Sequence, residues 1–391
     1  MSSTDPNIGR DLLGGQFQIL QKIGSGGMGS VYKAAQPDMN RMVAVKILHK
    51  KLVNRKDLMS RFRREARAMS HLTHPNTVKV LLYGELDDGS LYIVMEYLEG
   101  RNLNQVVRKE GPMSVDRAIP ILIQVCGALQ EAHLQGIVHR DLKPENIFLS
   151  TNGGLKDFPK VLDFGLAKVT ERELRPGSIM LTQEGMVFGT PEFMSPEQAQ
   201  GKVLDARSDI YSLATILYEM LTGKLPFDAK SPMEFIQLHV TKPPIPLDER
   251  VPGKVFAPGL GAALAKALEK KPEDRYSSAA EFAEALKPFA PAAVKDLAVM
   301  MPTSADLVIA QAVKGQAAAM EADKMASPHA SMVTPKKEEA APEPPAPPTR
   351  EIAKRDSRRR RTTPVVLILV AAGCLIAGVL LTIAALKLFG S

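Results

Sequence analysis

Residues 139–149 read HRDLKPENIFL, a run of charged side chains that passes directly into apolar ones. A charged run is usually only a solvated loop. Here, however, a basic, an acidic and a second basic residue stand close together, Asn146 follows, and the run continues into the apolar Ile147–Leu149. The segment forms a site only if the rest of the chain supplies partners for these charges.

The composition is that of a largely globular chain. Its 391 residues are 45% hydrophobic, with a formal net charge of +7. This length fits two or three average domains, or one large domain with appendages. Cys126 and Cys374 lie far apart, which argues against a disulfide framework and fits a reducing compartment. No apolar stretch follows a basic start at the N-terminus, so no secretory signal is expected.

A membrane anchor is predicted near residue 391. Val365–Leu386 is 22 residues without a charge, which as a helix spans roughly 33 Å and matches a bilayer. We therefore expect a transmembrane helix over 364–386 and a short tail over 387–391, with no domain beyond the span. Arg358–Arg361 precede it, and positive charge next to a span favours the cytoplasmic side and contact with lipid headgroups.

The stretch before this span differs in amino-acid composition from the rest of the chain. Residues 289–361 are rich in Pro, Ala, Lys and Glu, so we expect a flexible linker in which 294–324 has some helical character. Its PEPPAPP stretch favours a semi-rigid spacer over a polyproline ligand. One globular unit remains, over 17–288, preceded by an N-terminal segment over 1–16.

Gly24, Gly26 and Gly29 make a G-x-G-x-x-G pattern, in which missing side chains let backbone amides approach phosphate oxygens. A dinucleotide-binding loop would need a helix directly afterwards. Val31–Lys33 and Met42–Leu48 instead read as strands joined by a polar turn. We expect a glycine-containing hairpin.

The second of these strands carries Lys46 among apolar neighbours, where an ammonium needs an anionic partner. Glu65 is the candidate partner. It lies in a predicted helix, on the same stripe as Phe62 and Met69, whereas an ordinary solvated carboxylate would share the opposite face with Arg64.

Taken together, these motifs resemble the protein-kinase signature, in order and at suitable intervals. The matching residues are Gly24-x-Gly26-x-x-Gly29-x-Val31, Val43-Ala44-Val45-Lys46, Glu65, His139-Arg140-Asp141-Leu142-Lys143-x-x-Asn146, Asp163-Phe164-Gly165 and Ser195-Pro196-Glu197. IGSGGMGSVYKA and FGTPEFMSPEQ are most similar to the eukaryotic-like Ser/Thr kinases of bacteria. The resemblance implies an α+β, bilobal kinase fold over 17–288, with a small β-rich lobe and a larger helical lobe. Together with the predicted span and the basic run before it, this leads us to expect the kinase domain on the cytoplasmic side of a bacterial inner membrane.

The resemblance also assigns chemistry to the opening stretch. Asp141 would be the catalytic base that takes the proton of the substrate hydroxyl, and Lys143 would offer charge to the transferring phosphoryl group. Asn146 and Asp163 would bind Mg²⁺, for which Mn²⁺ can substitute. Lys46, fixed by Glu65, would hold the α- and β-phosphates of ATP. His139, Asp209 and Arg275, the last as partner of Glu197, would be structural.

The nucleotide site follows from the same resemblance. Val31 and Ala44 would sandwich adenine, Met95 would border the back of the pocket, and the backbone of Glu96 to Leu98 would hydrogen-bond the base. The full set of expected ATP contacts is Ile23, Gly24, Ser25, Gly26, Gly27, Met28, Gly29, Val31, Ala44, Lys46, Met95, Glu96, Leu98 and Phe148.

Regulation is expected on the segment from Asp163 to Glu197. Arg140 precedes the catalytic Asp and is placed to pair with a phosphate there, with Ser178 or Thr182 as the hypothetical phosphorylation sites. Thr190 resembles the structural Thr beside the substrate pocket. Two residues depart from the commonest pattern: Ser195 replaces an Ala, and Phe193 replaces a Tyr.

Three functions compete at this stage. An active Ser/Thr protein kinase that phosphorylates protein substrates, and itself in trans as a homodimer, is favoured by Lys143 and Thr190. A membrane-tethered kinase-fold scaffold would usually have lost Lys46, Asp141 or Asp163, all of which are present. A small-molecule phosphotransferase should lack the closing Ser-Pro-Glu motif. No nucleic-acid partner is expected, because the densest basic run abuts the predicted span.

Overall fold

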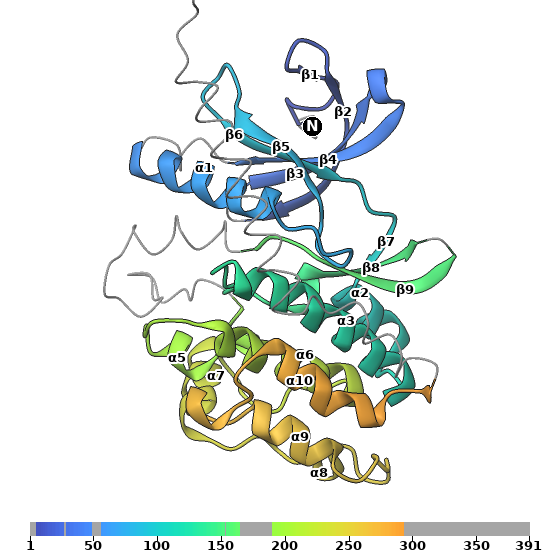
Figure 1. Ribbon diagram of the computed structural model, residues 1–391, viewed down its shortest axis with the longest axis vertical. Coiled ribbons are helices and arrows are strands. Elements are labelled where there is room, and N and C mark those ends of the chain that lie inside the picture. Colours follow the sequence, from blue (N-terminus) through green and yellow to red (C-terminus); the bar gives the residue numbers. More distant parts are fainter. Residues whose placement is uncertain (1–4, 27–28, 49–55, 153, 165–189, 293–391) are drawn as a thin grey trace, which may run out of the picture. The chain divides into compact units, whose positions relative to one another are not determined.

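The structure is a computed structural model that describes residues 5–26, 29–48, 56–152, 154–164 and 190–292. Within these ranges an antiparallel sheet with one helix beside it adjoins a larger helical part (Figure 1). The predicted α+β arrangement of a β-rich lobe and a helical lobe is therefore confirmed. The predicted linker, transmembrane helix and tail, together with Cys374, lie outside the described residues.

The smaller lobe is built on one six-stranded sheet in the order β1-β2-β3-β4-β6-β5, with every neighbouring pair antiparallel. The strands are β1 (Asp11–Leu12), β2 (Phe17–Gly26), β3 (Gly29–Gln36), β4 (Arg41–Leu48), β5 (Val80–Glu85) and β6 (Leu91–Glu96). The sheet begins inside the segment that sequence analysis set apart as 1–16, because Leu12 is buried and pairs with Phe17.

The hairpin predicted around the glycines is present. β2 and β3 pair through Gly26 opposite Gly29, and β3 reaches β4 through a single turn, η1 (Pro37–Met39). Asn40 ends that turn in the left-handed conformation, which Asn tolerates better than most side chains. The pairing of β3 with β4 sets Val31 opposite Lys46, so the lysine lies directly beside the glycine hairpin.

The helix α1 (Lys56–Ser70) carries one apolar stripe toward the sheet. Phe62, Ala66 and Met69 are buried at three- and four-residue spacing, while Arg63 and Arg64 are exposed. This confirms the predicted helix and its inward face.

The larger lobe is organised around α3 (Val115–Leu134) and α6 (Ala206–Thr222), which are buried along most of their lengths. A small sheet, β7 (Gly100–Asn102), β8 (Ile147–Asn152) and β9 (Leu155–Val161), lies between α3 and the upper lobe (Figure 1). The remaining elements are α2 (Leu103–Glu110), η3 (Pro144–Asn146), η4 (Pro191–Phe193), α5 (Pro196–Ala199), α7 (Pro232–Thr241), α8 (Leu247–Arg250), α9 (Leu260–Ala267), η5 (Pro272–Asp274), α10 (Ala279–Leu286) and η6 (Lys287–Phe289).

The chain between α1 and β5 is hydrogen-bonded to the larger lobe. The buried Glu131 of α3 accepts hydrogen bonds from the backbone N–H groups of Thr73 and His74, at 2.9 Å each. Further along, the Val78 N–H donates to the Val161 carbonyl at 3.0 Å. This connection therefore fixes the base of α1 to the helical lobe.

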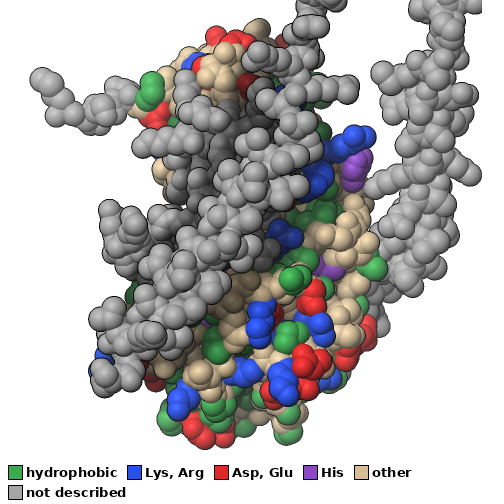
Figure 2. All heavy atoms as spheres, turned by 90° about the vertical axis from the view of Figure 1, so that its left-hand side faces the viewer, with side chains coloured by type: hydrophobic (Ala, Val, Ile, Leu, Met, Phe, Trp, Pro, Cys, Tyr) green, Lys and Arg blue, Asp and Glu red, His purple; other side chains and the backbone are tan. Residues whose placement is uncertain are grey.

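On the face seen in Figure 2, Lys and Arg side chains are interspersed with Asp and Glu over the helical lobe. Opposite charges placed this way do not form a single-sign field on that face. Cys126 is a free, buried thiol on α3, and burial raises its pKa. Searched over the described ranges, the chain contains no helix both long and apolar enough to cross a membrane.

Candidate active site

The opening stretch, 139–149, forms a loop that runs from the end of α3 into η3 and β8. His139 is fully buried and does not face the solvent. Its Nε2–H donates to the Leu162 carbonyl at 2.8 Å, and its Nδ1 accepts from the Asp141 N–H at 3.3 Å. The imidazole thus bridges this loop to the chain before Asp163, which confirms the structural role expected for it.

Asp209, near the start of α6, holds the same loop from below. Its buried carboxylate accepts the backbone N–H of His139 at 2.8 Å, that of Arg140 at 2.9 Å, and the His133 Nε2–H at 2.7 Å. Burial favours the neutral acid, but the hydrogen bond and charge of His133 outweigh it, and the pKa of Asp209 is lowered. A carboxylate that stays ionised can anchor Arg140, whose φ of 64° is unusual for a non-glycine residue.

The carboxylate of Asp141 lies between two polar side chains of the loop. Lys143 Nζ is 3.0 Å from Asp141 Oδ2, and the Asn146 amide donates to the Asp141 carbonyl at 2.8 Å. Asp141 faces a pocket whose lining comes from the loop, from η4 and from the two helices below. The lining residues are Arg140, Asp141, Leu142, Lys143, Thr190, Phe193, Met194, Gln198 and Ser212.

Lys46 on β4 pairs with Asp163, with 2.8 Å between Nζ and Oδ2. Burial favours the neutral form of Asp163, but the charge and hydrogen bond of Lys46 outweigh it, so the pKa of Asp163 is lowered. This differs from the Lys46–Glu65 pair expected from sequence, which is not among the ion pairs of the described residues. The buried ammonium needs a carboxylate close by, and here Asp163 supplies it while Glu65 lies half-buried on α1.

The glycines of the β2–β3 hairpin differ in how much space a side chain would have at each position. A Cβ on Gly29 would lie 2.2 Å from the Ile47 carbonyl oxygen, so the pairing of β3 with β4 excludes any side chain there. A Cβ on Gly26 would meet no atom within 4 Å, and one on Gly24 would make only ordinary contact with Val31. Space over Gly24 and Gly26 therefore stays open to an approaching group. Gly27 and Met28 lie outside the described residues.

The expected nucleotide contacts lie on the strands around this hairpin. Ala44 on β4 is buried and pairs with Met95 on β6, while Val31 is half-buried on β3. Leu98 and Phe148 are half-buried below them, whereas Ile23 is 45% exposed. Ser25 is exposed at the end of β2.

Glu96 ends β6 and is committed to neighbouring groups. Its N–H donates to the Lys79 carbonyl at 3.0 Å, and its carboxylate lies 2.7 Å from Lys160 Nζ. Any contribution of Glu96 to a ligand in this region therefore has to come from its carbonyl oxygen.

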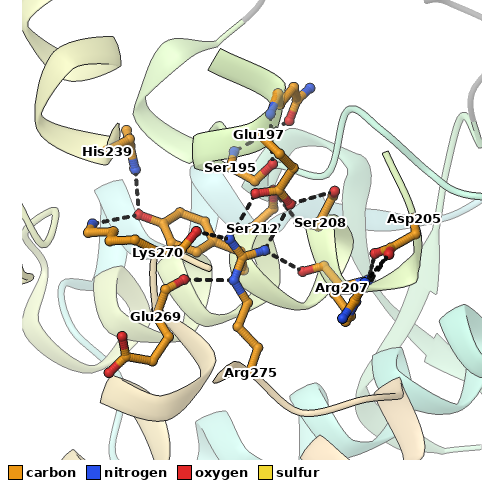
Figure 3. A network of polar contacts seen from close by, with 12 residues as sticks. Ser195, Glu197, Asp205, Arg207, Ser208, Ser212, His239, Glu269, Lys270 and Arg275 are labelled. Atoms are coloured by element: carbon orange, nitrogen blue, oxygen red, sulfur yellow. Dashed lines mark hydrogen bonds and ion pairs between the residues drawn. The ribbon is translucent and has the colours of Figure 1, made fainter. Parts of the chain in front are cut away.

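Glu197 and Arg275 lie 78 positions apart in sequence and form a buried bidentate ion pair, with both N–O distances 2.8 Å (Figure 3). Burial favours neutral Glu197, but Arg275 outweighs it and lowers the pKa of this carboxyl. Arg275 also donates to the carbonyls of Glu269, Lys270 and Arg207. The predicted pair is confirmed.

Ser195, which departs from the Ala of the commonest kinase motif, caps α5. Its hydroxyl accepts from the Gln198 N–H at 3.3 Å, and the Gln198 side chain accepts from the Ser195 N–H in return. Thr190 precedes η4 and lines the pocket with Asp141. Gly165, Ser178 and Thr182 lie outside the described residues.

Sequence reasoning missed one part of this region. His239 on α7 is fully buried and contacts Glu192 of η4, yet its only sign in the sequence is an isolated His between apolar residues. Such a pattern does not distinguish a functional imidazole from an ordinary core residue.

Comparison with known proteins places this geometry among kinases. The family model described as "Protein kinase domain" matches residues 17–287. The serine/threonine-protein kinase pkn3 of Myxococcus xanthus is 42% identical over 279 residues, covering 71% of this chain and 50% of that protein. The serine/threonine-protein kinase PknB of Mycobacterium tuberculosis is 42% identical over 272 residues, covering 69% of this chain and 42% of PknB. The matched region thus spans about half or less of these relatives.

A solved structure gives the same result for the fold. The crystal structure of the Mycobacterium tuberculosis PknI kinase domain superposes with a TM-score of 0.56 and 28% sequence identity. The match covers 72% of this chain and 99% of the PknI domain.

Proposed function

Because the chain belongs to the protein kinase family, we propose that it transfers the γ-phosphoryl group of ATP to Ser and Thr hydroxyls of proteins. The observation that carries this proposal is the convergence of Asp141 and Lys143 in one pocket, beside an Asp163 already paired with Lys46. Similarity to bacterial Ser/Thr kinases supports the choice of acceptor.

In the proposed reaction, Asp141 accepts the proton of the substrate hydroxyl as its oxygen bonds to the γ-phosphorus. The bond from that phosphorus to the bridging oxygen breaks, and ADP leaves with the electron pair. Lys143, at 3.0 Å from Asp141, is placed to offset charge on the transferring group. Both groups act mainly by position and charge, which is what phosphoryl transfer requires of a protein.

The residues near Asp141 fit a nucleotide and a hard divalent cation. The Asp163 carboxylate and the Asn146 amide oxygen are ligands that Mg²⁺ accepts, and this ion needs only a few protein ligands because phosphates and water supply the rest. Mg²⁺, or Mn²⁺ in its place, would supply positive charge to the phosphates. The open space over Gly24 and Gly26 suits phosphate oxygens, while Val31, Ala44 and Met95 offer apolar surface to adenine.

Label transfer from ATP tests this function. The full-length chain is incubated with ATP labelled in the γ-position, Mg²⁺ and dephosphorylated casein, and the casein is hydrolysed in acid to identify the labelled amino acids. We expect label on Ser and Thr that is lost when EDTA removes the metal. Transfer that persists unchanged in EDTA would contradict the assigned role of Asn146 and Asp163.

We propose further that Arg140 binds a phosphate on the segment between Asp163 and Glu197. The Arg140 Nε is buried without a hydrogen-bond partner in the described part of the chain, and a charge-assisted bond to a phosphate would satisfy it. We expect phosphopeptide mass spectrometry of active full-length chain to find Ser178 or Thr182 modified. Active protein that carries neither modification would refute this proposal.

We propose finally that the protein is anchored in a bacterial inner membrane by residues 364–386, with Arg358–Arg361 at the lipid headgroups. The charge-free length of Val365–Leu386 supports a single span, and tethering would promote phosphorylation between neighbouring copies. We expect the full-length chain to stay in the membrane fraction after alkaline carbonate extraction. Deletion of 364–386 should release it, and retention of the deleted form would contradict the anchor.

A further inference from the structure

His239 on α7 takes no part in the proposed chemistry, yet it is fully buried and makes two hydrogen bonds to other elements. Its Nε2 lies 3.0 Å from the Glu192 carbonyl of η4. Its Nδ1 lies 2.9 Å from the Tyr211 hydroxyl of α6, and this bond is the dashed line drawn from His239 in Figure 3. A carbonyl can only accept, so Nε2 carries the hydrogen. Nδ1 is then the acceptor, and the Tyr211 hydroxyl donates to it.

The chain of bonds continues to Lys270. Its ammonium, which can only donate, lies 3.4 Å from the Tyr211 oxygen and 4.7 Å from the centre of the Phe227 ring. Donors and acceptors therefore alternate without conflict from Lys270 through Tyr211 and His239 to Glu192. Burial also lowers the pKa of His239 to about 3, so the imidazole keeps this neutral form at ordinary pH.

This chain of bonds ends on η4, a turn whose neighbouring residues line the pocket that contains Asp141. Glu192 is the middle residue of η4, and Thr190 and Phe193 on either side of it line that pocket. The Phe227 ring packs edge-on against His239 with 4.8 Å between ring centres, which restricts the imidazole from moving aside. The position of η4 is thus set by α7 as well as by its own turn.

We infer that His239 is a positioning residue for the protein substrate, because it fixes the η4 wall against which the segment bearing the acceptor hydroxyl must lie. This inference rests on the proposed kinase function and adds to it a residue on α7. The proposed ATP contacts lie mainly on β2, β3, β4 and β6, none of which contacts His239 through a hydrogen bond, so the effect should fall on the protein substrate. Misplacing a positioned group by about 1 Å can cost an enzyme about 10²-fold, even when the mutation lies far from the reacting atoms.

Two variants of the full-length chain separate the effect of the His239 hydrogen bonds from the effect of the side chain's volume. His239→Leu removes both bonds at similar size, whereas His239→Gln keeps an N–H donor where Nε2 stands. We expect His239→Leu to raise the KM for casein about tenfold, because η4 loses the bond that holds it and the wall facing the substrate shifts. The KM for ATP should stay within about twofold of the wild-type value in both variants. The KM of His239→Gln for casein should lie close to the wild-type value and well below that of His239→Leu.

Phe282→Leu is the matched control for lost stability. Phe282 lies on α10, is fully buried and stacks on the ring of Tyr276. It is not among the residues that line the Asp141 pocket. An unchanged casein KM in His239→Leu, or an equal rise in Phe282→Leu, would overturn the inference. If His239→Leu fails to fold, His239→Asn, whose shorter side chain loses the donor at Nε2, should raise the casein KM relative to His239→Gln, and equal values would overturn it. A wild-type chain that labels neither casein nor itself would instead contradict the proposed function.

Discussion

Replacement of Asp141 by Asn is expected to lower kcat for casein phosphorylation by about 10²–10⁴-fold, the usual contribution of a positioned general base. The amide is nearly the same size and can still meet Lys143, which lies 3.0 Å from the native carboxylate. The amide of Asn, unlike the native carboxylate, cannot accept the proton of the substrate hydroxyl at neutral pH. Steady-state kinetics with labelled ATP would measure the loss.

The matched control is Asp116→Asn, the same chemical change at an exposed position in the first turn of α3. Its kcat should equal that of the wild type. ATP affinity should be retained in Asp141→Asn, because the expected nucleotide contacts lie on other residues. A kcat for Asp141→Asn within about tenfold of the wild type would exclude Asp141 as the base.

Removal of Arg275 is expected to have the largest effect on stability. Arg275→Leu leaves Glu197 buried without its bidentate partner, and breaking such a pair costs about 3–5 kcal/mol of unfolding free energy. Urea denaturation at pH 7 would measure it. Arg63→Leu is the control, since Arg63 is 60% exposed and pairs at the surface with Glu85; its expected cost is about 0–1 kcal/mol.

The deficit of Arg275→Leu should also depend on pH. In the wild type the pKa of Glu197 is lowered, so the pair stabilises the fold above the usual carboxyl pKa of 4.5 and loses this contribution as the pH falls. Without Arg275, burial, which is the largest influence on this carboxyl, outweighs the remaining hydrogen bond from the Ser208 hydroxyl and raises the pKa of Glu197. The difference in unfolding free energy between variant and wild type should therefore begin to narrow above pH 4.5, as Glu197 of the variant takes up a proton, and narrow further below 4.5, as the wild type loses the contribution of its pair. A gap that stays constant would show that the loss comes from packing and not from charge.

Local features of the fold were predictable from sequence because they depend on neighbours along the chain. The turn at Asn40 and the inward face of α1 follow from short-range patterns, whereas the strand from Ile147 was implied by the resemblance to kinases. The long-range pair of Glu197 with Arg275 was predictable only through the resemblance to kinases, since nothing in their separation indicates contact.

Other features depend on how elements pack, and there sequence reasoning was incomplete. Whether Lys46 meets Glu65 or Asp163 is decided by the position of α1 relative to the sheet, which no local pattern fixes. Leu12 adds a strand because it is buried against β2, although its surroundings contain turn-forming glycines. His239 acquires its partners from α6 and η4, both distant in sequence.

The most direct test of the central claim compares the full-length wild type with Asp141→Asn and Lys46→Met, after each is shown to be folded and the wild type to bind ATP. Each is given Mg²⁺ and ATP labelled in the γ-position, and the labelled amino acids of the protein itself are identified after acid hydrolysis. The account predicts label on Ser and Thr in the wild type that disappears in both variants. Folded, ATP-binding wild type that incorporates no label would contradict it and would favour a membrane-tethered kinase-fold scaffold.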